Sequence, residues 1–444
     1  MDNGIKSSKV FFGWWIVLVT GIVSGLGHGF YQYGLSVFFK DLAAELGLSR
    51  AVTSVAAGIG RFEGGITSPI VGWFSDRYGP RWIIFTGVCV AASGMVMMSF
   101  ITTVWAYFIV WGVIIGVGLN IGLTVAVDKT LNDWFVNKRG VALGIKFSLI
   151  GVGGVLSLPI VTWLVMTYGW RVSCLVWGCV MFVCAPITMI FVRQKRPEYY
   201  GFLPDGAAVG PGYDSETDDM VNRGVEYASG FQETEFTFKQ AIKTRAYWIL
   251  VVSFGAQAII VGGLTIHIIP FLTDMGIDRT VASSMMGMML LSMIPSTFLG
   301  GVVVDRIGKD NLKFILVGGF LLQAVGITAF LISGNTASLY LFLILYGFCG
   351  GASTPIFITI IGRFFGRKAF GSIFGCSIAI RTPISLMAPV FSGWIYDTSG
   401  SYIVAFIIYA ALAVFASLLM CLLKSEVLPV MIPDSTENKE ADPY

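Results

Sequence analysis

Three cations interrupt long apolar stretches of this 444-residue sequence: Arg61, Lys146 and Arg381. A charged side chain at the centre of a membrane-spanning helix costs about 2.5–3.5 kcal/mol on insertion scales, so each needs a compensating partner. Arg381 lies in the segment CSIAIRTPISL, and its planar guanidinium can bind a carboxylate through two parallel hydrogen bonds. Unpaired cations at Arg381 and Lys146 would favour an anionic ligand. The alternatives are that Arg381 binds backbone carbonyls freed by Pro383, and that Lys146 extends towards the membrane interface.

Two further ionisable side chains in apolar segments could carry a proton. His28 lies in the segment GLGHGFYQYG. A histidine in water has a pKa of about 6.5, so its charge can change within the physiological pH range. A satisfied hydrogen bond is the alternative role for His28. Glu63 is the second candidate for proton coupling, although Arg61, two residues away, makes a structural charge network the competing interpretation. The other polar residues expected beside a bound ligand are Tyr31, Tyr33, Asn120 and Gln257.

The segments that carry these residues are too apolar for a water-soluble protein. Hydrophobic residues make up 55% of the chain and charged residues only 12%, with a mean hydropathy of +0.79, whereas soluble domains carry about 25% charged residues. A water-soluble enzyme is therefore excluded. Windows of about 20 apolar residues predict membrane-spanning helices. Twelve such windows occur, at residues 12–38, 52–75, 82–101, 104–127, 140–163, 171–192, 246–271, 281–304, 312–332, 337–361, 369–394 and 402–423.

The basic residues predict how these helices are oriented. With the N-terminus in the cytoplasm, the tails, the even-numbered loops and the central linker hold 22 of the 29 lysines and arginines, and the outside loops hold four. The positive-inside rule then predicts that both termini are cytoplasmic. We expect a multi-pass protein of the plasma membrane, the inner membrane of a bacterium. The predicted organisation is an N-terminal six-helix bundle at 1–192, a linker at 193–245, a C-terminal six-helix bundle at 246–424 and a cytoplasmic tail at 425–444. The acidic, glycine-rich composition of the linker predicts a solvated segment whose only structure is a short helix near 236–244.

Charge and cysteine usage exclude several kinds of partner. The net charge of +3 is too balanced to indicate nucleic acid. The seven cysteines lie in apolar stretches and none forms a CxxC pair, so neither a metal site nor a disulfide framework is expected. No GxxxxGK(S/T) loop for nucleotide phosphates occurs, which argues against an ATP-driven pump. We expect no cofactor, no metal and no enzymatic activity.

The sequence contains an internal repeat. A shift of 229 residues aligns GLSVFFKDLAAELGLSRAVTS (34–54) with GLTIHIIPFLTDMGIDRTVAS (263–283) without a gap. The same shift superposes the Asp-Arg pair at 76–77 on the pair at 305–306. One offset that holds across separated blocks indicates two six-helix halves of common origin. Such halves are the usual construction of secondary transporters, whose substrate site lies between them near the middle of the bilayer.

Two loops resemble a known family signature. GWFSDRYGPR at 72–81 resembles the major facilitator superfamily motif between helices 2 and 3, and GVVVDRIGKD at 301–310 is similar to its degenerate copy between helices 8 and 9. The resemblance implies an all-α membrane protein with twelve transmembrane helices in two pseudo-symmetric bundles. Asp128 and Lys129, at the inner end of helix 4, are interpreted as gate or latch charges. The resemblance further implies a conformational latch whose charged residues are Asp76, Arg77, Arg81, Asp305 and Arg306.

Shorter segments resemble one group within this superfamily. ELGLSRAVTS (45–54), RPEYYGFLPDG (196–206) and FFGWWIV (11–17) are similar to stretches of monocarboxylate porters and of the oxalate/formate antiporter group. Relatives of this kind often carry an arginine in helix 8 shortly before the second Asp-Arg pair, where this chain has Ser296. Either Arg381 takes over the contact with the anion, or the substrate is not a simple monocarboxylate.

The resemblance implies a secondary transporter that moves a small organic anion, a mono- or dicarboxylate, by alternating access. It is expected to be a monomer in membrane lipid, driven by proton symport or by anion exchange. One alternative, favoured by Ser296, is an exporter of a neutral or amphipathic compound. The other is a transporter-like sensor that signals through residues 193–245, although this linker contains no recognisable interaction domain.

Overall fold

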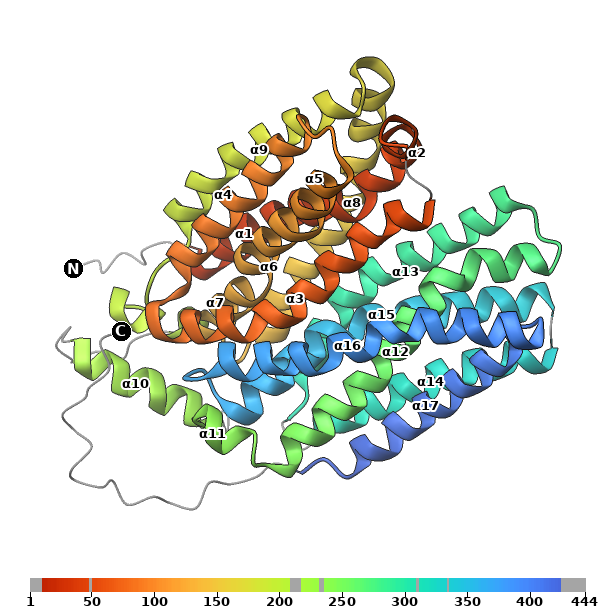
Figure 1. Cartoon of the computed structure of the whole chain (residues 1–444). Coiled ribbons are helices and arrows are strands. Elements are labelled where there is room, and N and C mark those ends of the chain that lie inside the picture. Colours follow the sequence, from red (N-terminus) through yellow and green to blue (C-terminus); the bar gives the residue numbers. More distant parts are fainter. Residues whose placement is uncertain are drawn as a thin grey trace, which may run out of the picture.

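The computed structural model describes residues 10–47, 50–207, 217–230, 235–308, 311–333 and 335–424. These residues form helices and connecting turns, and no strand occurs among them. An α-helix satisfies its backbone hydrogen bonds internally, which lipid requires because it offers no partner for them. The apolar windows of the sequence therefore become long helices (Figure 1).

The N-terminal half forms six spanning segments, two of which contain π-helical turns. The first consists of α1 (Phe12–Gly29), η1 (Phe30–Gly34) and α2 (Leu35–Glu45). The fourth consists of α5 (Val104–Tyr107), η2 (Phe108–Ile115), α6 (Gly116–Asn120), η3 (Ile121–Val125) and α7 (Ala126–Trp134). The other four are α3 (Arg50–Tyr78), α4 (Pro80–Met98), α8 (Arg139–Tyr168) and α9 (Trp170–Phe191). π-helical turns are frequent at functional sites, so those in the first and fourth segments mark candidate positions for such a site.

The C-terminal half repeats this plan with uninterrupted helices. They are α12 (Arg245–Asp274), α13 (Arg279–Arg306), α14 (Leu312–Ser333), α15 (Thr336–Phe365), α16 (Phe370–Ser399) and α17 (Ile403–Cys421). Eleven segments of the described chain are long and apolar enough to cross a membrane, and α3, which contains Arg61 and Glu63, is the twelfth long helix. The predicted fold of twelve helices is confirmed, and most helices extend a few residues beyond their predicted apolar windows.

One glycine fixes the turn between α3 and α4. Gly79 has a φ of 77°, a left-handed conformation that a side chain would strain. Pro80 follows at the first position of α4, where the missing N–H leaves no hydrogen bond unmade. The chain therefore reverses direction directly after the Asp-Arg pair, which holds Asp76 at the end of α3.

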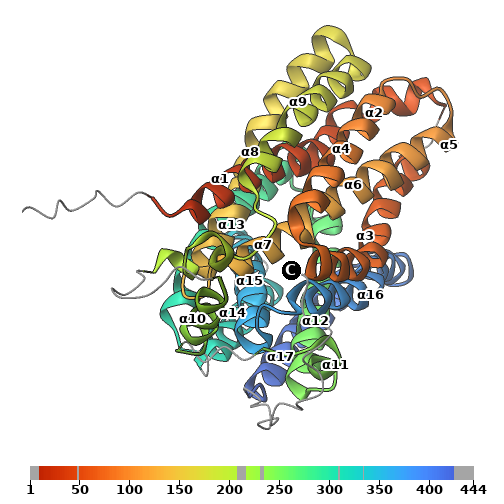
Figure 2. The ribbon, with the colours of Figure 1, turned by 90° about the vertical axis from the view of Figure 1, so that its left-hand side faces the viewer.

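The two halves meet at one end of the molecule and diverge towards the other (Figures 1 and 2). α3 packs against α16, and α8 packs against α13. A Cβ added at Gly72 would lie 2.0 Å from the carbonyl oxygen of Gly371, and one at Gly301 would lie 2.1 Å from that of Gly140. Only residues without side chains allow these backbones to approach so closely. We call this end, marked by Gly72, Gly140, Gly301 and Gly371, the closed end.

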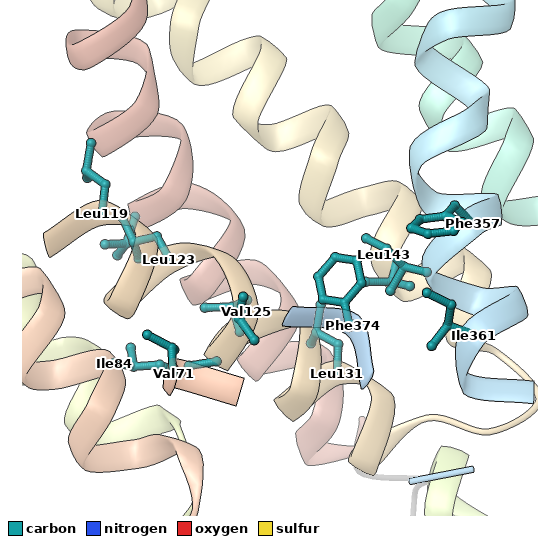
Figure 3. Close-up of a cluster of buried hydrophobic side chains, with 14 of the residues drawn as sticks. Val71, Ile84, Leu119, Leu123, Val125, Leu131, Leu143, Phe357, Ile361 and Phe374 are labelled. Atoms are coloured by element: carbon teal, nitrogen blue, oxygen red, sulfur yellow. The ribbon is translucent and has the colours of Figure 1, made fainter. Parts of the chain in front are cut away.

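An apolar core crosses between the halves near the closed end (Figure 3). Leu143 of α8 and Leu131 of α7 belong to the same buried cluster as Phe357, Ile361 and Phe374 of α15 and α16. A second buried cluster contains only residues of the C-terminal half, from α12 to α17. Burial of apolar side chains thus joins the halves at the closed end, where it adds to the backbone contacts.

The linker contains more structure than its composition predicts. The short helix α11 (Phe238–Ala241) lies where one was predicted, but the linker also contains η4 (Pro197–Tyr200), η5 (Pro204–Gly206) and the longer helix α10 (Thr217–Gly230). The prediction of a single short helix is therefore wrong. Met220, Gly224 and Ala228 are buried and four residues apart, so they form one face of α10. This spacing is a helical signal that the acidic composition obscures.

Candidate functional site

Arg381 lies near the middle of α16 without an acidic partner. Its Nε donates a 3.0 Å hydrogen bond to the carbonyl oxygen of Ser377, and its guanidinium carbon lies 4.5 Å from the centre of the Phe357 ring. Within the described ranges Arg381 forms no ion pair, and its two Nη groups make no hydrogen bond. Gly255 of α12 leaves room beside it, since an added Cβ would lie 3.9 Å from the Arg381 Cγ. The guanidinium fork is therefore available to a ligand.

Lys146 is paired, contrary to the expectation of a second unpaired cation. Its Nζ lies 2.9 Å from Asp128 Oδ1, and both side chains are only 1% exposed. The Nζ also lies 4.2 Å from the centre of the Phe147 ring. Asp128 precedes Lys146 by eighteen residues on α7, so the charge partner comes from the fourth spanning segment. The expectation that Lys146 extends to the interface is also wrong, because the ammonium group is enclosed.

His28 lies at the end of α1, just before the π-helical turn η1. Its Nδ1 donates to the carbonyl oxygen of Ser24 at 3.1 Å, which leaves Nε2 as the nitrogen that can accept a proton. Tyr31, within η1, stacks on Trp111 with ring centres 5.2 Å apart. The side chain of Tyr33, predicted to contact a ligand, lies outside the described residues.

Asn120 and Gln257 occupy different environments. Asn120, between the two π-helical turns of the fourth segment, donates to the Gly64 carbonyl oxygen at 2.9 Å and to Thr67 Oγ1 at 2.6 Å. Its amide therefore connects this segment to α3.

Gln257 is buried inside the C-terminal half and lines a groove beside α14 and α15. Ser296 is fully buried and close to Gly351 of α15, so this position has no room for an arginine side chain.

Glu63 is half-buried on α3. Both carboxylate oxygens are enclosed, and the Thr67 side chain is a polar group beside them. The hydroxyl of Thr67 donates to the backbone carbonyl of Glu63 at 3.2 Å. The side chain of Arg61 lies outside the described residues, so the predicted charge network around it is not described. An enclosed carboxyl group of this kind is a candidate proton carrier.

Asp76 joins the two halves at the closed end. Its carboxylate accepts hydrogen bonds from the backbone N–H groups of Gly371 and Ser372, at 2.9 and 2.7 Å, and from the Ser372 hydroxyl. These N–H groups belong to the first turn of α16, where no carbonyl within the helix can accept them. The ammonium of Lys129 lies 3.6 Å from the same carboxylate. A negative charge here also complements the helix dipole of α16.

Asp305 makes the equivalent contact from the other half. It accepts from the N–H groups of Gly140 and Val141 at the start of α8, at 2.8 and 2.7 Å. The Nη2 of Arg363 lies 3.5 Å from Asp305 Oδ1.

The remaining three latch candidates face outward or bind elsewhere. Arg77 lies over the rings of Trp73 and Tyr78. Arg81 donates to the Met189 carbonyl oxygen, and Arg306 is exposed.

A charge network that the sequence did not reveal surrounds Arg367. This arginine is fully buried, and its Nη1 donates to Glu198 of the linker at 2.8 Å and to the Asp133 carbonyl oxygen of α7 at 3.2 Å. Lys129 donates to the Arg367 carbonyl oxygen at 2.7 Å. Arg367 therefore connects the C-terminal half to the N-terminal half and to the linker. A glutamate after a proline in the linker is not distinctive enough in sequence to identify this partner.

The linker also caps the loops that precede α8 and α16. Asp205, with a φ of 61°, accepts from the N–H groups of Val136, Asn137 and Lys138 at 2.8–3.2 Å. Glu235 accepts from the N–H group of Lys368 at 2.6 Å. Burial would raise the pKa of Glu235, but the nearby guanidinium groups of Arg196 and Arg367 outweigh it and hold this pKa below its usual value. Each loop thus has its own carboxylate from the linker.

Replacing Lys146 by methionine should strongly destabilise the protein, because Asp128 would remain buried without a counter-charge. Loss of one member of a buried pair costs about 3–5 kcal/mol. The double variant Lys146→Met/Asp128→Leu should recover most of this loss, and Lys138→Met, which removes an exposed lysine, should change little. Thermal unfolding of the purified proteins measures all three. If Lys146→Met unfolds at the wild-type temperature, the buried pair is not structural.

Replacing Glu198 by glutamine should loosen the closed end, because Arg367 loses its charge partner. A hydrogen bond to a charged group contributes about 1.5–3 kcal/mol, which corresponds to roughly ten- to hundredfold faster amide exchange in the affected segment. Hydrogen exchange of residues 365–373, followed by mass spectrometry, measures this change. Glu45→Gln, which removes the exposed pair of Glu45 with Arg171 at the opposite end, is the matched control. Equal exchange in Glu198→Gln and wild type would show that the linker does not hold the closed end.

Comparisons with known proteins agree with this architecture. The Major Facilitator Superfamily profile matches residues 17–384 and 270–442. Monocarboxylate transporter 13 of Rattus norvegicus is 23% identical over 400 residues, which cover 90% of this chain and 86% of that protein. The human organic anion transporter MFSD10 superposes with a TM-score of 0.67 at 14% identity, covering 92% of this chain and 99% of that one. The E. coli fucose:proton symporter superposes with a TM-score of 0.70 at 11% identity, covering 94% and 99%. The chain belongs to the Major Facilitator Superfamily of membrane transporters.

Proposed function

We propose that this transporter moves a small organic anion, a mono- or dicarboxylate, by alternating access. The observation that carries the proposal is the Arg381 guanidinium, which lies in a spanning helix with no acidic partner in the described chain. Lys146 has its own carboxylate, so of the two intramembrane cations whose side chains are described, Arg381 is the one that a substrate can neutralise. The matched relatives include a monocarboxylate transporter and an organic anion transporter, which supports the same substrate class.

Two features favour binding of a carboxylate at Arg381. Its Nε is already held by the Ser377 carbonyl, so the fork is oriented before substrate arrives and less side-chain freedom is lost on binding. The Phe357 ring covers one face of the guanidinium, which leaves its edge to form two parallel hydrogen bonds. A neutral substrate would leave this charge uncompensated in the membrane. Export of a neutral compound is therefore the less favoured alternative.

The contacts at the closed end support alternating access. There the halves are held by the two aspartate caps, the Arg367 network and a shared apolar core. The opposite ends of the halves diverge in Figure 1. In the proposed cycle, substrate enters from the divergent end, and breaking the caps opens the other end. We further propose that the closed end is cytoplasmic in a plasma membrane, because the basic loops lie there.

Proton coupling is proposed to involve Glu63, with His28 as the second candidate. The Glu63 carboxylate is enclosed and forms no ion pair among the described residues, and accepting a proton removes its buried charge. The Nε2 of His28 is left to accept a proton because Nδ1 donates to Ser24. Release of the proton and of the anionic substrate on the same side of the membrane would constitute symport.

Substitutions at Arg381 test the proposed anion site. Arg381→Gln should lower the affinity for the carboxylate by roughly 30- to several-thousand-fold, since removing one side of a desolvated charge pair costs about 2–5 kcal/mol. Arg381→Lys should retain part of the binding, because the charge remains while the fork is lost. Binding to purified protein is measured by thermal shift across a panel of carboxylates, amino acids and neutral solutes. Arg223→Gln, on α10, is the matched control.

A folded Arg381→Gln protein that still binds the identified anion within about threefold of wild type would place the site elsewhere. Binding of neutral solutes that is unchanged by Arg381→Gln would favour the exporter of neutral compounds. Absence of flux in proteoliposomes for every ligand that binds would favour the sensor.

Glu63→Gln should abolish accumulation driven by a pH gradient and preserve exchange of substrate across the membrane. Glutamine resembles the protonated carboxyl group but cannot release a proton. Uptake and counterflow in proteoliposomes measure the two activities separately. Full accumulation in Glu63→Gln would transfer the proposed role to His28, for which His28→Gln is the corresponding test.

A further inference from the structure

A groove on the C-terminal half is lined by neither Arg381 nor the residues that contact it. It is lined by Leu299 and Val303 of α13, by residues of α14 from Phe314 to Gln323, and by Cys349 and Ser353 of α15. Its volume is about 300 Å³, at the lower end of the range of small-molecule pockets. Leu299, Val303 and Phe314 are 41–58% exposed, so the groove opens on the outer face of the helices, which lipid covers.

Two buried amides lie in this apolar groove. Gln323 is 1% exposed and Gln257 is 5% exposed. Neither the Oε1 nor the Nε2 of Gln323, nor the Oε1 of Gln257, has a hydrogen-bond partner in the described chain. An unmade hydrogen bond of a buried group costs about 1–3 kcal/mol. Two such side chains lie in one groove, at the centres of α12 and α14. They therefore indicate that a bound molecule supplies the missing hydrogen-bond partners.

The amides define the chemistry of the occupant. The unpaired atoms include two acceptors and one donor, so a group that both donates and accepts, such as a hydroxyl, satisfies more of them than a group that only accepts. An acyl chain of lipid offers neither. The lining contains no charged side chain, so a charged group would be costly at this depth. Phe314 and Gln323 are separated by about 14 Å along the helix axis, which matches an extended chain of roughly ten carbons.

The wall of the groove provides the space for such a chain. A Cβ added at Gly318 or Gly319 would meet no atom within 4 Å. By contrast, a Cβ added at Gly300 on the opposite wall would lie 2.9 Å from Ala352, so not every glycine here leaves space. The openings beside Gly318 and Gly319 therefore form the free volume along α14.

We propose that this groove binds a neutral, largely apolar molecule with one hydroxyl group, which enters from the lipid and donates and accepts hydrogen bonds at Gln323 and Gln257. The site is separate from Arg381 and does not depend on the proposed transport of anions. A ligand that bridges α12, α13, α14 and α15 holds these helices together, so it also regulates how the C-terminal half moves as a body.

The test uses the full chain in lipid nanodiscs and a ten-carbon primary alcohol that carries a diazirine. After illumination, the labelled peptides are identified by mass spectrometry. Labelling should fall in residues 299–303, 314–323 and 348–356. An excess of 1-decanol should suppress it at least tenfold more effectively than the same excess of decane, which has the same chain without the hydroxyl.

Variants separate the hydroxyl contact from plain apolar binding. Gln323→Leu should reduce the labelling about tenfold and should raise the melting temperature of the unliganded protein, because it removes an unpartnered amide. Gly318→Leu should abolish the labelling by filling the groove. Gly287→Leu, at another glycine with open space but outside the groove, is the matched control and should label as wild type.

Equal suppression by decanol and decane, or unchanged labelling in Gln323→Leu, would overturn the proposal. The first result would show an apolar surface without polar recognition, and the second would show that the amides are satisfied by water or by each other. Wild-type labelling in Gly318→Leu would also overturn it, since the ligand would then lie elsewhere. Carboxylate binding to the same variants reports independently on the Arg381 site.

Discussion

Backbone N–H groups at the start of a helix need acceptors from outside that helix, and two helices of this chain obtain them from the opposite half. Asp76 accepts from the first turn of α16, and Asp305 accepts from the first turn of α8. The other contacts of the closed end surround these two aspartate caps. The glycine pairs bring the backbones within reach, Lys129 and Arg363 lie beside the two carboxylates, and the linker holds the loops that precede both helices.

The internal repeat explains why the two contacts match, but the linker makes the closed end asymmetric. Each loop is capped by a linker carboxylate, Asp205 in one half and Glu235 in the other. Glu198, however, forms its ion pair within the described part of the chain with Arg367, on the C-terminal side. Duplication therefore accounts for two equivalent contacts, and the segment between the copies adds a further contact beside one of them. The conformational equilibrium of such a chain depends on the linker as well as on the spanning helices.

The sequence predicted features that depend on local composition or on the repeat. Apolar windows located the helices, and the shift of 229 residues located both Asp-Arg pairs. It could not predict the partner of Lys146, because contact with Asp128 depends on how the fourth and fifth segments rotate against each other. Nor could it predict that Gln257 lies in a groove of the C-terminal half although His28 is its equivalent in the repeat. The lack of an acidic partner for Arg381 among the described residues could be predicted, because an isolated cation in an apolar helix is visible without any knowledge of packing.

The glycine contacts have a consequence for the energy barrier of the conformational change. Gly72 meets Gly371, and Gly140 meets Gly301, through backbone atoms, and the Val304 side chain also lies against Gly140. Interlocked side chains would have to change rotamer, or leave the hollows that hold them, before two helices could separate. Backbone surfaces without side chains can separate without any change of rotamer. At these crossings the halves can slide or tilt against each other without a rotamer change, so the resistance there comes from a few hydrogen bonds, whereas the apolar core beside the crossings must still be unpacked.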